Sequence, residues 1–178
     1  MFAIIGNVPN FKSILLMNSK RYFLITVVIL FSILPFCSFS QSSIPAFKMQ
    51  LTNGKIFTAS QLSNQKPTII IYFAPDCEHC QVLMNELFKK MNDFKTAQLV
   101  MVTFEPLKEL IGFEKKYQTW KYPNIKVGSE VPVFFFRYLY KVDHTPFTAL
   151  FNKNGKMVVQ YKEQTPVTDL LKNLKTLK

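Results

Sequence analysis

The chain has 178 residues, and its 22 Lys and Arg against 11 Asp and Glu give a formal net charge of +11. The lysines are dispersed and form no dense basic run, which argues against a nucleic-acid-binding patch and favours a solvated, lysine-rich surface. The sequence holds three cysteines, which argues against a structural disulfide framework. With 48% hydrophobic residues, a chain of this length can instead stabilise one domain by burying an apolar core.

The N-terminal part has the features of a secretory signal peptide. Lys20 and Arg21 precede the apolar run YFLITVVILFSILPF (22–36), and the small residues Ser38 and Ser40 occupy the −3 and −1 positions of a cleavage site. We therefore predict that the protein is exported to the periplasm and that cleavage follows Ser40.

These features divide the sequence into a signal peptide over 1–40 and one domain over 41–178. Because Met17 stands shortly before the basic residues, translation from Met17 is an alternative start. The apolar run is somewhat shorter than the ~20 residues of a membrane-spanning helix. An uncleaved N-terminal membrane anchor, with the domain facing the periplasm, is the alternative to cleavage.

The first half of the domain begins with strand signals and then becomes helical. Residues 46–62 predict two short strands around Asn53–Gly54, a dipeptide typical of tight hairpins. Residues 67–74 form a continuous β-branched and aromatic run, which predicts a strand buried on both faces. From Glu78 the apolar residues recur with a helical period, which predicts a helix to about Asn92.

The middle of the domain is less regular. Residues 97–104 predict a second buried strand, and residues 106–120 predict a helix. Residues 122–132, YPNIKVGSEVP, are expected to form an additional loop. The aromatic run over 131–142 is compatible with a strand or a helix, and we predict a short helix because Pro132 is typical of a helix start.

The end of the chain predicts an antiparallel hairpin followed by a helix. Residues 146–152 and 156–162 flank Asn154–Gly155, again a hairpin dipeptide. Residues 165–175 predict a closing helix with Thr165 as its N-cap. This order of elements predicts an α/β sandwich in which helices cover both faces of a central mixed sheet.

The segment YFAPDCEHCQ (72–81) carries the chemistry that the sequence indicates most strongly. Cys77 and Cys80 are three residues apart at the start of the helix predicted from Glu78, so they share a face and can close a Cys77–Cys80 disulfide. The helix N-terminus stabilises a thiolate, which is the nucleophile in disulfide exchange. We predict that Cys77 is the exposed attacking sulfur and that Cys80 is the shielded resolving sulfur.

Three neighbours of the cysteines are candidates for tuning the thiol pKa. A protonated His79 would stabilise the Cys77 thiolate, whereas the charges of Asp76 and Glu78 would oppose it. Asp76 is also a candidate cap for the helix. Because these effects have opposite signs, they predict no redox potential.

Two other interpretations of the cysteine pair stay open. A zinc site needs four ligands, but the domain has no second cysteine pair, and its histidines are His79 and His144. Copper binding by Cys77, Cys80 and a histidine such as His144 is chemically reasonable, since thiolates select Cu(I). The third interpretation is a non-catalytic interaction domain. We assign no metal ligand and no bound cofactor.

The motif and a distant Thr-Pro pair together carry a family resemblance. A strand, Cys-x-x-Cys at a helix start, and then Thr145–Pro146 before a hairpin with an NGK turn resemble the thioredoxin superfamily, and more narrowly its secreted TlpA-like thiol–disulfide oxidoreductases. The resemblance covers about residues 45–176. It implies a thioredoxin-like three-layer sandwich with an added N-terminal β-hairpin. It also implies a cis Thr145–Pro146 bond beside the dithiol, where the substrate chain binds.

The resemblance implies an exported enzyme that exchanges disulfides with protein substrates, acting as a reductase, and that a redox partner protein resets. The sequence departs from the family at three positions: Asp76 replaces the usual aromatic residue before the first cysteine, Ile71 replaces a buried acid, and Asn85 replaces the proline that bends the active-site helix. Glu86 and Glu105 are candidate substitutes for that acid. The additional loop over 122–132 is expected to lie over the active site.

Overall fold

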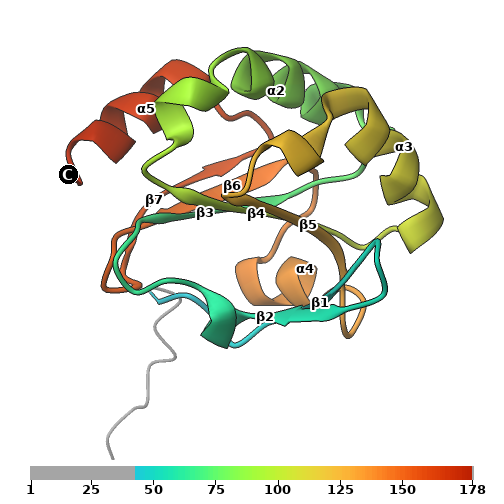
Figure 1. The fold of residues 1–178 in the computed structure, drawn as a ribbon. Coiled ribbons are helices and arrows are strands. Elements are labelled where there is room, and N and C mark those ends of the chain that lie inside the picture. Colours follow the sequence, from blue (N-terminus) through green and yellow to red (C-terminus); the bar gives the residue numbers. More distant parts are fainter. Residues whose placement is uncertain (1–42, 178) are drawn as a thin grey trace, which may run out of the picture. The chain divides into compact units, whose positions relative to one another are not determined.

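The computed structural model describes residues 43–177. These residues form one seven-stranded mixed sheet, in the order β2-β1-β5-β4-β3-β6-β7, with helices on both faces (Figure 1). The signal peptide predicted over 1–40 and the expected domain start at Gln41 lie outside the described residues, so both stay predictions.

The strands are β1 (Lys48–Leu51), β2 (Ile56–Thr58), β3 (Thr68–Tyr72), β4 (Gln98–Thr103), β5 (Ile125–Glu130), β6 (Phe147–Phe151) and β7 (Met157–Lys162). The α-helices of the described chain are α2 (Glu78–Lys89), α3 (Leu107–Tyr117), α4 (Phe135–Tyr140) and α5 (Val167–Lys175). Short 3-10 helices are η1 (Ala59–Gln61), η2 (Met91–Phe94) and η3 (Thr119–Lys121).

The centre of the sheet is parallel and its two sides are antiparallel. Strand β4 pairs in parallel with both β3 and β5, so the C-terminal ends of these three strands lie at one edge of the sheet. The hairpin β6–β7 continues the sheet beside β3, and the hairpin β1–β2 continues it beside β5. Both predicted hairpins are therefore confirmed, including the N-terminal one.

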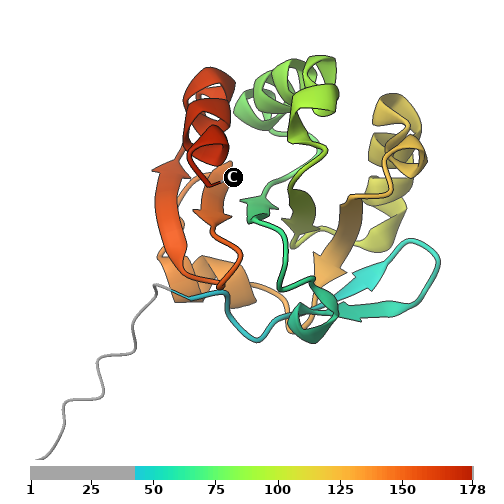
Figure 2. The same ribbon diagram turned by 60° about the vertical axis from the view of Figure 1, so that its left-hand side comes forward.

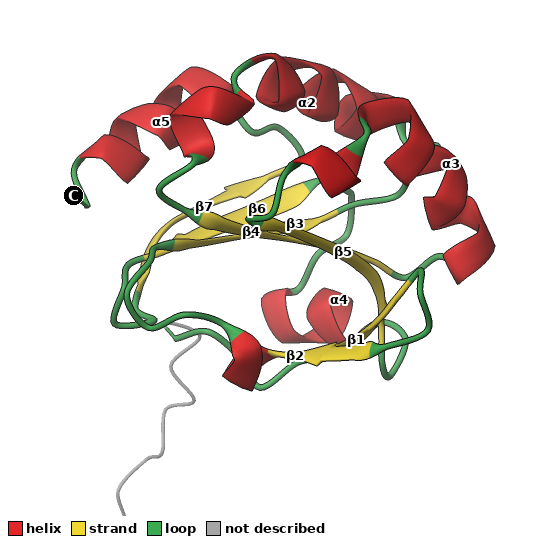
Figure 3. Cartoon of the chain, in the orientation of Figure 1, coloured by secondary structure: helices red, strands yellow, loops and turns green. Residues whose placement is uncertain are grey.

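Two hydrophobic cores hold the helices against the sheet, because β3 buries both of its faces. Ile69 and Ile71 pack with side chains of α2, α3 and α5, whereas Ile70 and Tyr72 pack with α4. Figures 2 and 3 show α2, α3 and α5 along one face and α4 on the other. Full burial of one Ile side chain contributes about 2 kcal/mol. The predicted three-layer sandwich is thus confirmed, with β3 stabilised from both sides.

The expectation of a loop over 122–132 is wrong, because most of this segment is strand β5. Its residues alternate as in a half-buried strand: Ile125 and Val127 are buried, and Lys126 is exposed. Gly128, which weakens the strand signal, is required by close packing, since a Cβ atom there would lie 2.7 Å from the backbone O of Gln50 in β1. Pairing with β4 and β1 thus outweighs the low β-propensity of glycine.

The predicted helices are all present, with shorter bounds than expected. Helix α2 ends at Lys89 and α3 ends at Tyr117, and each is followed by a 3-10 turn. The short helix predicted within 131–142 is α4. The prediction of Thr165 as the N-cap of α5 is wrong: Pro166 holds that position, and the Thr165 hydroxyl instead donates to Oγ1 of Thr148 at 2.8 Å.

Candidate active site

Both cysteines of the described chain lie at the N-terminus of α2, after the short segment that follows the inner strand β3. The helix begins at Glu78, and Cys77 is its N-cap residue, with φ −70° and ψ 123°. The Sγ atom of Cys77 accepts a hydrogen bond from the backbone N–H of Cys80 at 3.4 Å. Free N–H groups and the positive end of the helix dipole stabilise an anion at this position, so the fold places Cys77 where a thiolate is favoured.

The two thiols are free in this structure, and they differ in burial and pKa. Cys77 is half-buried, whereas Cys80 is 1% exposed. Burial raises the pKa of Cys80 to about 12, and its hydrogen bond with Cys77 adds to the increase. Burial also acts to raise the pKa of Cys77, but hydrogen bonds from the side chains of Cys80 and Thr145 and from the N–H groups of Cys80 and His79 lower it below its ordinary value.

Sheet pairing brings Thr145 and Pro146 to the cysteines from a distant part of the chain. Strand β6 is antiparallel to β3, with Phe147 opposite Tyr72, so the residues before β6 lie next to those after β3. The Cys77 thiol donates to the carbonyl O of Thr145 at 3.4 Å, across 68 residues of sequence. The Thr145–Pro146 bond is cis, as the resemblance implies, and Pro146 is buried. That these residues bind substrate stays a prediction.

The candidate tuning residues Asp76, Glu78 and His79 are all exposed. The suggestion that Asp76 caps α2 is wrong, because Cys77 itself is the N-cap residue. His79 acts on the pKa of Cys77 through its backbone N–H. Since burial and hydrogen bonds are the leading causes of both cysteine pKa shifts, the side-chain charges of these three residues are not needed to explain them.

On the α4 face of the sheet, the structure holds a buried carboxyl group that the sequence did not predict. Glu130, at the end of β5, is 2% exposed. Its Oε1 accepts hydrogen bonds from the Tyr72 hydroxyl at 2.8 Å and the Phe134 N–H at 2.7 Å, and its Oε2 accepts one from the Phe136 N–H at 2.9 Å. Burial raises the pKa of Glu130 despite these donors. Its carboxyl group therefore attaches the start of α4 to the end of β3.

Neither acid suggested from the sequence takes a buried position. Glu86 is exposed on α2, and Glu105 is half-buried after β4. Glu130 was missed because its segment was interpreted as a loop. The signal that could have found it is the alternation of Ile125 and Val127 with polar residues, which is typical of a strand.

Two cavities are lined by residues next to the active-site segments. The α4-side cavity, of ≈150 Å³, lies against Tyr72 and Thr145 and includes Arg137, Asp143 and His144 in its lining. The α2–α5 cavity, of ≈300 Å³, is formed by residues of α2 from His79 to Glu86 and by residues 163–166 before α5. His79, which stands between the two cysteines in sequence, lines the α2–α5 cavity, so this cavity begins at the same turn of α2 that carries the dithiol.

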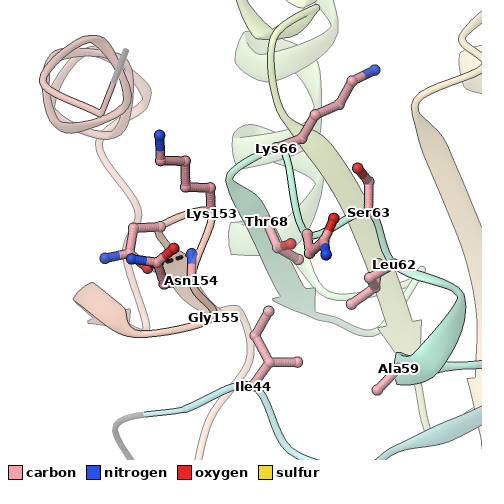
Figure 4. Close-up of a pocket in the computed structure, with 11 residues that line it drawn as sticks. Ile44, Ala59, Leu62, Ser63, Lys66, Thr68, Lys153, Asn154 and Gly155 are labelled. Carbon is pink, nitrogen blue, oxygen red and sulfur yellow. Dashed lines mark hydrogen bonds between the residues drawn. The ribbon is translucent and has the colours of Figure 1, made fainter.

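A larger cavity, of ≈540 Å³, lies far from the cysteines (Figure 4). It includes Thr68, the first residue of β3, and Gly155 in the β6–β7 turn, whereas Cys77 follows the other end of β3. Lys66 and Lys153 stand on either side of it. Its position at the opposite end of the sheet separates it from the chemistry of the two thiols.

A half-buried N-cap thiol, a buried partner one helical turn away and an adjacent proline loop define a thioredoxin-type site on a thioredoxin-like fold. Residues 58–178 match the family model described as a thioredoxin-like domain. The chain belongs to this thioredoxin-like domain family.

Solved structures share the fold at low sequence identity. A secreted disulfide oxidoreductase of Mycobacterium tuberculosis has a TM-score of 0.61 and 16% identity, over 74% of this chain and 96% of that chain. The exposed lipoprotein thioredoxin Etrx1 of Streptococcus pneumoniae has a TM-score of 0.55 and 22% identity, over 75% of this chain and 100% of that chain. A SCO1/SenC family lipoprotein of Bacillus anthracis has a TM-score of 0.64 and 19% identity, over 78% of this chain and 96% of that chain. No curated protein matches the sequence significantly.

Two properties of the described residues concern metals and membranes. Among residues 43–177, the His, Cys, Asp and Glu side chains form no group of three or more that could hold a metal ion. Within the same range, no helix combines the length and the apolar character that a membrane crossing requires.

Proposed function

We propose that the protein is an exported thiol–disulfide oxidoreductase that reduces disulfides in protein substrates. The observation that carries this proposal is the difference between the two thiols: the Cys77 pKa is lowered at the helix N-terminus, while burial raises the pKa of Cys80 to about 12. A nucleophile must be ionised and accessible, whereas a resolving thiol acts only after the first bond has formed.

The reaction then proceeds in two exchanges. The Cys77 thiolate attacks one sulfur of the substrate disulfide, that S–S bond breaks, and the other substrate sulfur leaves as a thiolate. Cys80 loses its proton and attacks Sγ of Cys77, which releases the second substrate thiolate and leaves a Cys77–Cys80 disulfide. The substrate gains two electrons and the protein loses two. A redox partner protein supplies electrons to restore the dithiol, and no bound cofactor takes part.

Thr145 and Pro146 are the proposed substrate-contact residues. The Thr145 carbonyl O lies 3.4 Å from Cys77 Sγ, so a chain whose cysteine reaches Cys77 passes beside this backbone. Extended peptides commonly bind such a backbone edge by strand-like pairing. The position beside the nucleophile is the support for this assignment.

Export is the proposed location of this activity. The support is the basic, then apolar, then small-residue pattern that ends at Ser40. Two of the similar structures are of proteins described as secreted and as an exposed lipoprotein, respectively. The expected compartment is the periplasm, with the domain free or held by an uncleaved N-terminal anchor.

Reduction of insulin disulfides tests the proposed activity. We expect Cys77→Ser to abolish turnover and Cys80→Ser to accumulate mixed disulfides with the substrate. Cys37→Ser in the full chain is the matched control and keeps activity. Turnover by Cys77→Ser, or faster alkylation of Cys80 than of Cys77 in the reduced protein, contradicts the proposed roles.

The direction of electron flow needs its own measurement. The redox state of Cys77 and Cys80 in the exported protein can be trapped in cells by rapid alkylation. A mostly reduced pair is expected for a reductase, and a mostly oxidised pair indicates an oxidase instead.

A further inference from the structure

We propose that the α2–α5 cavity binds a Lys or Arg side chain of the protein substrate, so that the enzyme prefers disulfides with a cationic residue near the reacting cysteine. The inference rests on the proposed function and adds a substrate class to it. The groups that select the cation are the carboxylates of Glu86 and Glu163, on opposite walls of the cavity.

The cavity is attached to the reacting atoms through short contacts. The backbone N–H of Glu163 donates to the carbonyl O of Pro146 at 2.9 Å. The preceding residue, Thr145, is the one whose carbonyl O lies 3.4 Å from Cys77 Sγ. On the other wall, His79 directly precedes Cys80. One wall of the cavity is therefore bonded to the loop that contacts Cys77, and the other belongs to the helix turn that carries Cys80, so a residue next to a substrate cysteine at Cys77 is within reach of this cavity.

The charge of the cavity is opposite to that of the chain. Glu86 and Glu163 are exposed, and the one ion pair found among residues 43–177 joins Lys108 to Glu109, so neither carboxylate is paired with a basic side chain of this range. His79 is the other titratable side chain in the lining. With a net charge of +11 on the whole chain, two unpaired carboxylates beside the dithiol attract a cation where most of the surface repels one.

The rest of the lining fits the apolar stem of a long cationic side chain. Val82 is 55% exposed, and Leu83 and Pro166 contribute further apolar surface. Lys and Arg bury their methylene stems on such surface while the charged group stays in contact with water and polar groups. The volume of ≈300 Å³ is ample for one such side chain.

Buried contacts hold the second wall in place. The Thr165 hydroxyl donates to Oγ1 of Thr148, inside β6, at 2.8 Å. Glu163 has a φ of 65°, a left-handed conformation that is uncommon for residues other than glycine. The backbone bond to Pro146 and the Thr165 contact thus position this wall before a substrate arrives.

The other cavities do not offer the same selection. The α4-side cavity carries Arg137 and His144 next to Asp143, so it differs in charge from the α2–α5 cavity. In the cavity of Figure 4, polar groups such as Asn152 Oδ1, which accepts from the N–H groups of Asn154 and Lys156, are already bonded within the protein.

Peptide disulfides that differ in one residue test the proposal. The substrates share one sequence and carry Lys, Gln or Glu in turn at each position flanking the cysteine, and kcat/KM is measured for the full domain at low ionic strength. At one position, we expect the kcat/KM of wild type to be higher for the Lys peptide than for the Gln peptide by about 5-fold per carboxylate. This is the effect of a solvent-exposed contact between two unit charges about 4 Å apart. The preference should weaken as salt is added.

Variants assign the preference to the cavity. Glu86→Gln and Glu163→Gln should each reduce the Lys-to-Gln ratio, and the double variant should abolish it. Glu86→Lys should favour the Glu peptide. Asp93→Asn is the charge-matched control, because Asp93 is exposed beyond the far end of α2 and does not line the cavity, and it should keep the wild-type ratio.

The outcomes separate this inference from the proposed function. Equal kcat/KM for the Lys, Gln and Glu peptides, or a preference that survives in the double variant, overturns the cationic cavity and leaves the oxidoreductase activity standing. A failure of wild type to reduce any of the peptides or insulin overturns both.

Discussion

Cys77 and Cys80 show how burial and a few hydrogen bonds give two identical side chains different acidity. Desolvation penalises the thiolate at both positions, and at Cys80 it prevails and raises the pKa to about 12. At Cys77, donors at the helix start and from Thr145 outweigh it and lower the pKa. The hydrogen bond from Cys80 is the largest of these lowering contributions, so the two thiols are expected to titrate as a coupled pair.

This coupling predicts different effects for two substitutions of Cys80. Cys80→Ala should raise the pKa of Cys77 above that in Cys80→Ser, because the serine hydroxyl keeps a donor beside Cys77 Sγ and alanine removes it. The pH dependence of Cys77 alkylation, followed by mass spectrometry, has its midpoint at the pKa of Cys77. Asp93→Asn serves as the control and should leave the midpoint unchanged. Identical midpoints in the alanine and serine variants would show that this hydrogen bond does not matter.

Glu130 predicts a pH dependence of stability. Burial raises its pKa in the folded protein, whereas the unfolded chain titrates near ~4.3. Its stabilising contribution is therefore complete below about pH 4 and is lost as pH rises, because the unfolded chain releases the proton first. Urea unfolding at a series of pH values should show a free energy of unfolding that falls with pH in wild type relative to Glu130→Gln.

The same variant tests the hydrogen bonds of Glu130. Its amide N–H₂ group would face the N–H of Phe136, which now donates to Oε2 at 2.9 Å. We expect Glu130→Gln to lose about 1–3 kcal/mol at neutral pH, since a buried donor is left without an acceptor. Glu109→Gln, on the exposed side of α3, is the control. Parallel pH profiles for wild type and Glu130→Gln would falsify the titration of Glu130.

At the level of elements, β5 depends on pairing with both of its neighbours. It joins the parallel centre to the N-terminal hairpin, with Gly128 opposite Leu51 of β1 and opposite Val102 of β4. A Cβ atom at Gly128 would lie 2.7 Å from the backbone O of Gln50. The backbone of β1 approaches this strand closely because glycine has no side chain there.

Two Gly-to-Ala substitutions are expected to change stability in opposite directions. Gly128→Ala should reduce the free energy of unfolding by about 1–3 kcal/mol, the usual effect of overpacking, because the new methyl group meets backbone rather than a flexible side chain. Gly112→Ala, inside α3 where a Cβ atom meets nothing within 4 Å, should add about 1 kcal/mol through helix propensity. Denaturant unfolding measures both, and an unchanged or more stable Gly128→Ala would disprove the close approach.

At the scale of the whole molecule, we predict that the protein is exported and that the segment up to Ser40 is cleaved off. We expect intact-mass analysis of the exported protein to give an N-terminus at Gln41. Ser40→Arg should block cleavage, because the −1 position accepts small residues, and should leave residues up to 40 attached. Ser43→Arg, beyond the site, is the matched control. An exported wild-type protein that retains residues 22–36 would instead be a membrane-anchored enzyme.

The sequence alone determined most of the elements and the chemistry of the dithiol. Hairpin dipeptides at Asn53–Gly54 and Asn154–Gly155, the buried β3 run and the helical period after Glu78 are local patterns, and each led to the correct element. The position of Cys77 at a helix start is also local, because strand, turn and helix follow one another within a few residues. Local preferences of this kind are set by neighbouring side chains and backbone, so they can be predicted without the fold.

Only the tertiary structure decided how distant residues meet. The β3–β6 pairing places the Thr145 carbonyl O 3.4 Å from Cys77 Sγ, and the close approach of β1 explains Gly128 in a strand. The burial of Glu130 and the position of Glu163 opposite Glu86 likewise come from elements far apart in sequence. Burial and charge depend on every group that packs nearby, and a one-dimensional pattern does not contain those neighbours.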